Sequence, residues 1–249
     1  MKKIFWVIAG VLFLLAIPYK VSKLESFQFF GELVSRVETS EKIVSLTFDD
    51  GPTNGKTEEI LAILKENEVR ATFYLVGEAM TKNMDQTKLI VNQGHEIGNH
   101  SYSHQKMMLK GYNFVREEID RTNELIRQAG YLGQVTFRAP YGRKLFVLPY
   151  FLQKNNIISV MWDVEPDSIL PLDASPEELI DYAIENTKPG SIILMHVMFN
   201  SRSNSMTAIP GIIKGLKSRG YRFVTVSELI NNNGEHNKAI DTEQKSIEH

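Results

Sequence analysis

From Glu41 onward, short β-rich runs alternate with longer stretches whose apolar residues have a helical period. Runs at 43–48, 71–76, 95–99, 135–137, 157–162, 191–195 and 223–226 predict strands. Stretches at 56–67, 86–92, 114–129 and 176–186 predict helices, because their apolar residues recur every three or four positions. Such alternation indicates an α/β fold with a parallel sheet and helices outside it. We expect a closed or nearly closed barrel of about seven strand–helix units, with an open doubly wound sheet as the alternative.

The two ends of the chain differ from this pattern. Lys2 and Lys3 precede an apolar run from Ile4 to about Pro18, which is typical of an export signal or an anchor helix. The run falls just short of the roughly 17–25 residues of a spanning helix, and no small-residue cleavage site follows it. We favour an uncleaved anchor over a cleaved signal or a buried core helix.

The chain therefore divides into four predicted parts: an anchor at 1–20, a membrane-proximal connector at 21–40, one folded domain at 41–230 and a mobile polar tail at 231–249. An anchor of this kind places the domain outside the cytoplasm, attached to the cell membrane, and secretion after cleavage is the alternative.

Composition excludes several classes of function. The formal net charge is -2, so no basic surplus is available for nucleic acid, and we expect no such partner. The chain has no cysteine, which excludes disulfides, thiolate metal sites and a cysteine nucleophile. We expect a monomer.

Side chains suited to catalysis stand at the predicted strand ends, where barrel enzymes place their active sites. Asp49 and Asp50 follow the first strand, and such neighbouring carboxylates repel each other unless a cation lies near them. His100 and His104 lie four residues apart, so on a helical turn both face one side and suit a metal. A turn and two exposed histidines are the alternatives. Two histidines and one carboxylate suit catalytic Zn(II), Co(II), Ni(II) or Fe(II).

Further strand ends carry Arg138 and His196, and the segment from Trp162 to Asp167 follows the fifth strand. An arginine at such a place can hold a carboxylate by two parallel hydrogen bonds, with a surface salt bridge as the alternative. His196 follows a fully apolar run, so we expect it to point into the same opening as the other residues.

Four of these motifs, in this order, resemble those of the polysaccharide deacetylase family, also called NodB-homology or carbohydrate esterase family four. The motifs are Thr47–Pro52, His100–His104, Arg138–Tyr141 and Leu194–His196, and the resemblance covers about residues 41–230. It implies a distorted (β/α) barrel fold. It also implies an enzyme that uses a divalent metal to hydrolyse N-acetyl groups of an amino-sugar polymer, with release of acetate.

The resemblance also implies a role for each residue, with Zn(II) favoured as the metal and Co(II) or Ni(II) as alternatives. It assigns metal binding to Asp50, His100 and His104, base catalysis to Asp49, orientation of that base to Arg138, general acid catalysis to His196, oxyanion binding to the backbone N–H of Tyr141, and the acetyl pocket to Leu194. We place Trp162 in the substrate site as well.

The fourth family motif is altered. Where the family has Asp-x-x-Asp-Trp, this chain has Glu165-Pro166-Asp167-Ser168-Ile169. We expect Glu165 to hold the acid His196, with Asp163 and Asp167 as alternatives, and Ile169 to stand in place of the pocket tryptophan. An O-acetyl (xylan-type) esterase and a catalytically silent carbohydrate-binding relative remain alternatives. The predicted anchor favours peptidoglycan over a chitin-like polymer.

Overall fold

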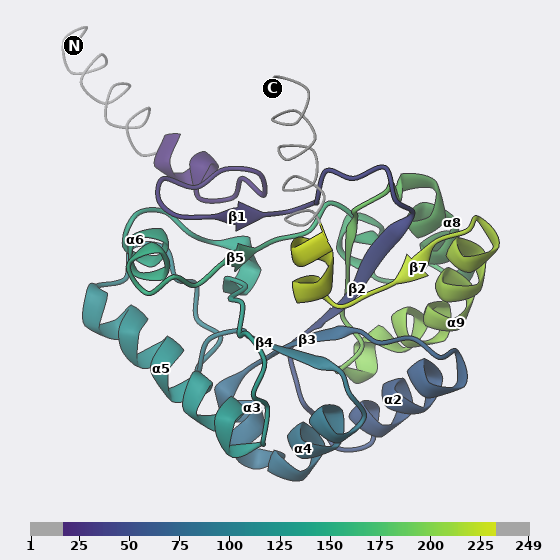
Figure 1. Cartoon of the computed structure of the whole chain (residues 1–249), viewed down its shortest axis with the longest axis horizontal. Coiled ribbons are helices and arrows are strands. Elements are labelled where there is room, and N and C mark those ends of the chain that lie inside the picture. Colours follow the sequence, from purple (N-terminus) through teal and green to yellow (C-terminus); the bar gives the residue numbers. More distant parts are fainter. Residues whose placement is uncertain (1–16, 233–249) are drawn as a thin grey trace, which may run out of the picture.

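The structure, a computed structural model, describes residues 17–232 and shows parallel strands surrounded by helices (Figure 1). The larger sheet has the order β4-β3-β2-β6, and a fifth strand, β7, pairs with β2. These strands are β2 (Ile43–Asp49), β3 (Thr72–Leu75), β4 (Glu96–Asn99), β6 (Ile192–Met195) and β7 (Arg222–Phe223). A second parallel pair joins β1 (Leu33–Val34) to β5 (Ser159–Val160). The predicted α/β class is thus confirmed.

Helices cover the outside of the strands in Figure 1. They are α2 (Lys56–Glu66), α3 (Gly77–Lys82), α4 (Met84–Asn92), α5 (Tyr112–Gln128), α6 (Val147–Lys154), α7 (Pro166–Ile169), α8 (Pro176–Asn186) and α9 (Ser203–Ser218), with 3₁₀ turns η1 (Pro140–Gly142) and η2 (Asn200–Arg202). The four predicted helices correspond to α2, α4, α5 and α8. Helix α8 begins where predicted because Ser175 and Glu178 form a capping box at its first turn.

The two sheets are joined by single-residue bridges rather than by continuous ladders. Phe137 pairs with Asn99 of β4 and with Ser159 of β5, and Val164 pairs with Ile193 of β6. The strand predicted at 135–137 is reduced to these bridges, and the strand predicted at 157–162 is only two residues long. The α/β fold with its parallel sheet is therefore established, whereas a closed barrel of seven units is not confirmed.

The predicted connector at 21–40 packs against the domain. Its residues Leu33 and Val34 form β1, and Lys144 donates from Nζ to the carbonyl of Leu24 at 2.6 Å. The predicted anchor lies outside the described residues except for 17–20, as does the predicted tail except for 231–232. Over residues 17–232, no helix is both long enough and apolar enough to cross a membrane.

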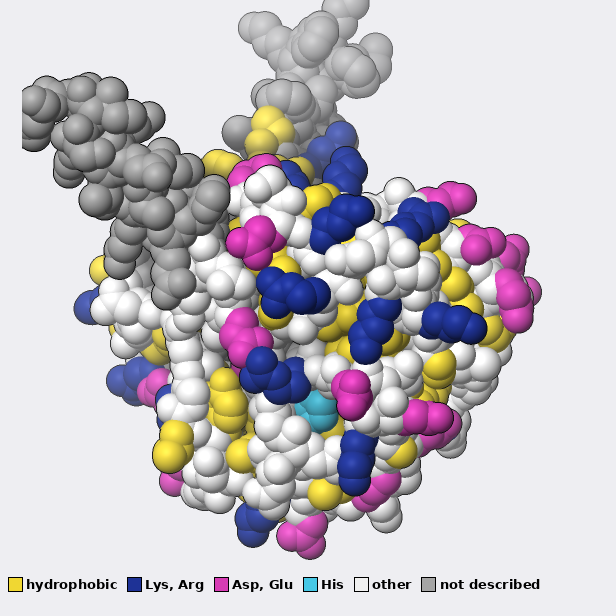
Figure 2. Space-filling view, turned by 45° about the vertical axis from the view of Figure 1, so that its right-hand side comes forward, with side chains coloured by type: hydrophobic (Ala, Val, Ile, Leu, Met, Phe, Trp, Pro, Cys, Tyr) yellow, Lys and Arg dark blue, Asp and Glu magenta, His cyan; other side chains and the backbone are white. Residues whose placement is uncertain are grey.

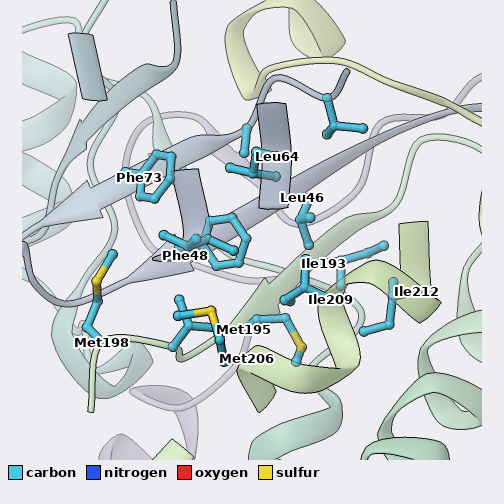
Figure 3. Close-up of a cluster of buried hydrophobic side chains, with 14 of the residues drawn as sticks. Leu46, Phe48, Leu64, Phe73, Ile193, Met195, Met198, Met206, Ile209 and Ile212 are labelled. Atoms are coloured by element: carbon cyan, nitrogen blue, oxygen red, sulfur yellow. The ribbon is translucent and has the colours of Figure 1, made fainter. Parts of the chain in front are cut away.

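The main hydrophobic core lies between the larger sheet and its helices (Figure 3). The tilted rings of Phe48 and Phe73 contact each other, with centroids 5.1 Å apart, and Leu64 of α2 packs on the same cluster. All seven residues of β2 are buried, and its two hydroxyl side chains are satisfied inside the fold, because Ser45 and Thr47 donate to the Val224 and Ile193 carbonyls at 3.0 and 2.8 Å. This buried strand ends at Asp49 and so fixes the position of Asp49 and of Asp50, which follows it.

The surface carries both signs of charge. On the face shown in Figure 2, lysine and arginine side chains lie among aspartates and glutamates rather than in a field of one sign. This mixture agrees with the nearly balanced formal charge of the sequence.

Gly190 allows the segment before β2 to pass close to the turn before β6. Its carbonyl accepts from the Val37 N–H at 2.9 Å, and its own N–H donates to the Ile43 carbonyl at 2.8 Å. The residue has a φ of +79°, and an added Cβ would lie 1.8 Å from the Val37 carbonyl oxygen. Any side chain here must displace the backbone that it contacts.

Replacing Gly190 by alanine should therefore cost more stability than the same change at Gly94. Gly94 has the same φ of +79°, but an added Cβ there meets nothing within 4 Å. Gly94→Ala should lose only the cost of a left-handed alanine, about 1–2 kcal/mol. Gly190→Ala should lose roughly 1–3 kcal/mol more because of the overlap. Urea unfolding of both variants measures this, and equal losses would contradict the steric argument.

Candidate metal centre and active site

The carboxyl end of β2 turns sharply between two aspartates. Asp49 is the last strand residue, and Asp50 adopts a left-handed conformation with a φ of 72°. Neighbouring side chains of an extended strand point to opposite faces, whereas this change of conformation lets both carboxylates line one cleft. Aspartate tolerates the left-handed region better than most residues do.

The two histidines lie on an irregular loop after β4, which corrects the predicted helical turn. Ser101 and His104 both have positive φ, 65° and 54°. The loop is held by Glu118 of α5, whose carboxylate accepts from the N–H groups of Tyr102 and Ser103 at 3.0 and 2.8 Å. A buried carboxylate thus replaces the helical hydrogen bonds that the spacing had suggested.

Asp50, His100 and His104 come together as a possible metal site. Their ligand atoms all lie within 4.8 Å of one another. His100 Nδ1 lies 2.8 Å from the Arg138 carbonyl, so an N–H at this position donates to it and leaves Nε2 free for a metal. Two imidazoles and one carboxylate suit a divalent transition metal with open positions.

Asp49 is bound by Arg138, whose side chain is completely buried. Arg138 Nη1 donates to Asp49 Oδ1 at 2.6 Å and to Thr47 Oγ1 at 2.8 Å, while Nη2 donates to the Met161 carbonyl. The predicted alternative of a surface salt bridge is therefore wrong, and Asp49 receives one of these hydrogen bonds rather than two. Burial raises the pKa of Asp49, but the Arg138 charge, together with other nearby cationic groups, brings it below its ordinary value.

His196 is held by Asp167. The Nδ1 atom of His196 lies 3.1 Å from Asp167 Oδ1, and the backbone N–H of His196 donates to Asp167 Oδ2 at 2.7 Å. Burial lowers the pKa of His196, but the hydrogen bond and charge of Asp167 outweigh burial and raise it to about 9.

The prediction that Glu165 holds His196 is wrong. Glu165 instead accepts from the indole N–H of Trp162 at 2.8 Å. The reason is local: α7 begins directly after Glu165, and this short helix carries Asp167 to the end of β6. Asp163, the other alternative, binds Ser191 and the Ile192 N–H.

The sequence profile of the family described as polysaccharide deacetylase matches residues 36–156. A peptidoglycan-N-acetylglucosamine deacetylase of Bacillus cereus is 37% identical over 188 residues, which cover 75% of this chain and 67% of that protein. The chain belongs to the polysaccharide deacetylase family. It is thus a hydrolase that acts on the carbon–nitrogen bond of N-acetyl groups.

Solved structures of this family have the same fold. A peptidoglycan N-acetylglucosamine deacetylase in complex with 4-naphthalen-1-yl-N-oxidanyl-benzamide has a TM-score of 0.74 at 33% identity, over 78% of this chain and 91% of that chain. A pseudoenzyme of carbohydrate esterase family four from Bacillus anthracis has a TM-score of 0.70 at 30% identity, over 79% and 68% of the two chains.

In this deacetylase, nine of the ten site residues predicted from the sequence line one cleft of about 750 Å³. They are Asp49, Asp50, His100, His104, Tyr141, Trp162, Glu165, Leu194 and His196. Arg138 lies beneath the cleft, where it binds Asp49. Tyr141 adopts a left-handed conformation with a φ of 58°, and its ring centroid lies 4.8 Å from that of His104.

Part of the cleft wall was not predicted. Lys23, Glu25 and Arg143 line it, yet no motif marks the first two because they come from the supposed connector. Ile169, expected in place of the pocket tryptophan, is 63% exposed. Ser168 and Leu172 line the cleft beside it.

Replacing Asp167 should change the protonation of His196 more than replacing Glu165. In Asp167→Asn the imidazolium loses its anionic partner, so the pKa of His196 should fall from about 9 toward or below 6.5. In the unmodified protein, His196 keeps its proton until the pH passes about 9. In the variant, the lowered pKa should leave the His196 imidazole largely neutral above about pH 7. An NMR titration of metal-free protein measures this shift.

Glu165→Gln is the matched control, because it removes the charge of a neighbouring carboxylate that binds Trp162 instead. Its effect on the pKa of His196 should be clearly smaller. An equal fall in both variants would return Glu165 to the role predicted from the sequence.

Proposed function

We propose that this chain is a metal-dependent deacetylase of cell-wall peptidoglycan. One observation carries the proposal: a buried carboxylate and a histidine with a raised pKa share one cleft with the Asp50, His100 and His104 cluster. Amide hydrolysis needs both a base that activates water and an acid that protonates the departing nitrogen. Asp49 and His196 supply these two functions.

Asp49 acts as the base. Arg138 favours its ionised form, so Asp49 can accept a proton from the water whose oxygen bonds to the acetyl carbon. Because the guanidinium is buried and holds Asp49 Oδ1, the carboxylate keeps one orientation during the reaction.

His196 acts as the acid. Its Nδ1 atom is engaged by Asp167, which leaves Nε2 to face the substrate. The proton goes to the nitrogen as the carbon–nitrogen bond breaks, and the products are acetate and a free amine. The high pKa of His196 keeps this proton available at neutral pH.

The remaining cleft residues bind the acetyl group. The backbone N–H of Tyr141 stabilises the charge that develops on the carbonyl oxygen, and one such donor is typically worth about 3–4 kcal/mol. Leu194 lines the cleft and contacts the acetyl methyl. A divalent metal on Asp50, His100 and His104, with Zn(II) favoured over Co(II) or Ni(II), supplies Lewis acidity at the carbonyl.

Two features support peptidoglycan as the polymer. Two of the three similar proteins named above are peptidoglycan N-acetylglucosamine deacetylases. The apolar run at residues 4–18 favours a membrane anchor that places the domain outside the cytoplasm, facing the cell wall. Whether the attacked sugar is N-acetylglucosamine or N-acetylmuramic acid is tested by acetate release from fragments in which only one of them is acetylated.

The silent carbohydrate-binding relative is the second candidate, because a structural neighbour is a pseudoenzyme. The presence of Asp49, Arg138 and His196 with close partners argues against it here. An O-acetyl esterase is the third, and comparing N-acetylated with O-acetylated oligosaccharides separates the two activities.

Asp49→Asn should leave metal binding intact but lower the rate of acetate release by roughly 10²–10⁴-fold, the usual contribution of a general base. The variant keeps the size of the side chain and loses its ability to accept the proton. Acetate release from peptidoglycan fragments with added Zn(II), together with metal content, measures both properties. Full activity in this variant would remove Asp49 from the role of base.

Asp50→Ala should show the opposite order of effects, because Asp50 belongs to the metal cluster. Metal content after dialysis should fall, and activity should recover in part at high Zn(II) concentration. These two adjacent carboxylates thus serve as controls for each other. Undiminished metal content in Asp50→Ala would take Asp50 out of the ligand set.

A further inference from the structure

An exposed cluster of aromatic rings lies at one end of the molecule, where residues 27–30 meet α6. The ring centroids of Phe29 and Phe146 are 4.5 Å apart, those of Phe30 and Tyr150 are 5.9 Å apart, and those of Phe27 and Phe29 are 5.2 Å apart. Each of these five side chains is between 39% and 47% exposed. We call them the aromatic face.

This concentration of apolar side chains is unusual for a protein surface. Among the described residues, more than half of the exposed large apolar side chains lie within 17–30 and 146–150. Soluble monomers rarely leave such a contiguous patch without a partner. The rings pack on one another across two segments, so the patch is a built surface.

The segment that carries the face is fixed to the domain. Lys144, only 2% exposed, donates from Nζ to the Leu24 carbonyl, and its backbone N–H donates to the Ser22 carbonyl at 3.1 Å. Figure 1 shows this segment running beside α6 before it enters β1. A buried ammonium group needs such a partner, so the contact holds residues 22–24 in place.

The chain that leads into this face is apolar. Residues 4–16 continue the apolar run outside the described part, and that part opens with Ile17 and Tyr19, 44% and 47% exposed. Lys20 and Lys23 are exposed between them and the aromatic face. Aromatic and aliphatic side chains mixed with lysines are the composition of segments that lie in a membrane interface.

We propose that the aromatic face rests in the lipid–water interface of a membrane, with Lys20 and Lys23 against anionic headgroups. A platform for sugar rings is the competing explanation. None of the five rings lines the cleft. Two of the three ring pairs meet edge to face, at 78° and 79°, so they do not present the open flat surface on which a sugar stacks.

This docking goes beyond the catalytic proposal, and it orients the cleft. Lys23 and Glu25 line the cleft and belong to the same segment as Phe27 and Phe29. A membrane in contact with the aromatic face therefore lies beside the opening of the cleft. The substrate reached in this orientation is glycan close to the membrane surface.

A single-cysteine label on the full chain tests the docking, since the natural sequence has no cysteine. Phe29→Cys, carrying a bimane fluorophore, is reconstituted in phosphatidylcholine vesicles with about one quarter phosphatidylglycerol, the surface charge that attracts lysines. Nitroxide-labelled lipids then quench a label that lies in the interface. Leu132→Cys, at a residue 87% exposed, is the control. Leu132 follows the far end of α5, about 25 Å from the Tyr112 end that packs on Phe151 of α6.

We expect quenching of the label at residue 29 to be at least roughly twice that of the label at residue 132, because residue 29 would lie in the aromatic belt. Equal quenching at the two positions, or a chain that does not associate with vesicles, would overturn the proposal. A response of residue 29 to soluble chito-oligosaccharide without vesicles would show a sugar platform instead. A response to added unlabelled protein would show self-association. Activity on soluble fragments is independent of all these outcomes, so catalysis and docking can fail separately.

Discussion

The buried ion pair of Arg138 and Asp49 is the interaction on which the active site depends. The guanidinium is fully buried, and it binds β2 through Asp49 and Thr47 and the chain after β5 through the Met161 carbonyl. It also lies 4.0 Å from the centre of the Tyr74 ring on β3. Taking such a charge out of water is costly, and a full set of hydrogen bonds offsets that cost. One side chain thus holds three neighbouring chain segments in place around Asp49, the proposed base.

Much of the site could be predicted because its residues stand where apolar runs end. Asp49, Arg138 and His196 each stand at the end of a buried segment, and the motifs around them resemble those of the family. The order of the motifs was enough to place these residues at one end of the sheet. The candidate metal ligands Asp50, His100 and His104 lie together although the loop that carries the histidines is not helical.

What the sequence did not indicate depends on contacts between distant segments. Glu165 and Asp167 are both carboxylates two positions apart, and only the start of α7 decides which one contacts His196. Leu33 and Val34 form a strand because β5 lies beside them, so no local period marked this part of the predicted connector. Bridges at Phe137 replace a predicted strand for the same reason: pairing partners, rather than propensity, decide its length.

Trp162 is one of only two tryptophans in the chain, and the other, Trp6, lies outside the described residues. Its indole lines the cleft, donates to Glu165, and lies 5.5 Å from the buried guanidinium of Arg138. An indole between an anion and a cation changes its emission when water or a sugar replaces one of its neighbours. The contact between Glu165 and this ring therefore has an optical consequence: within residues 17–232, tryptophan fluorescence comes from the cleft alone and reports its occupancy.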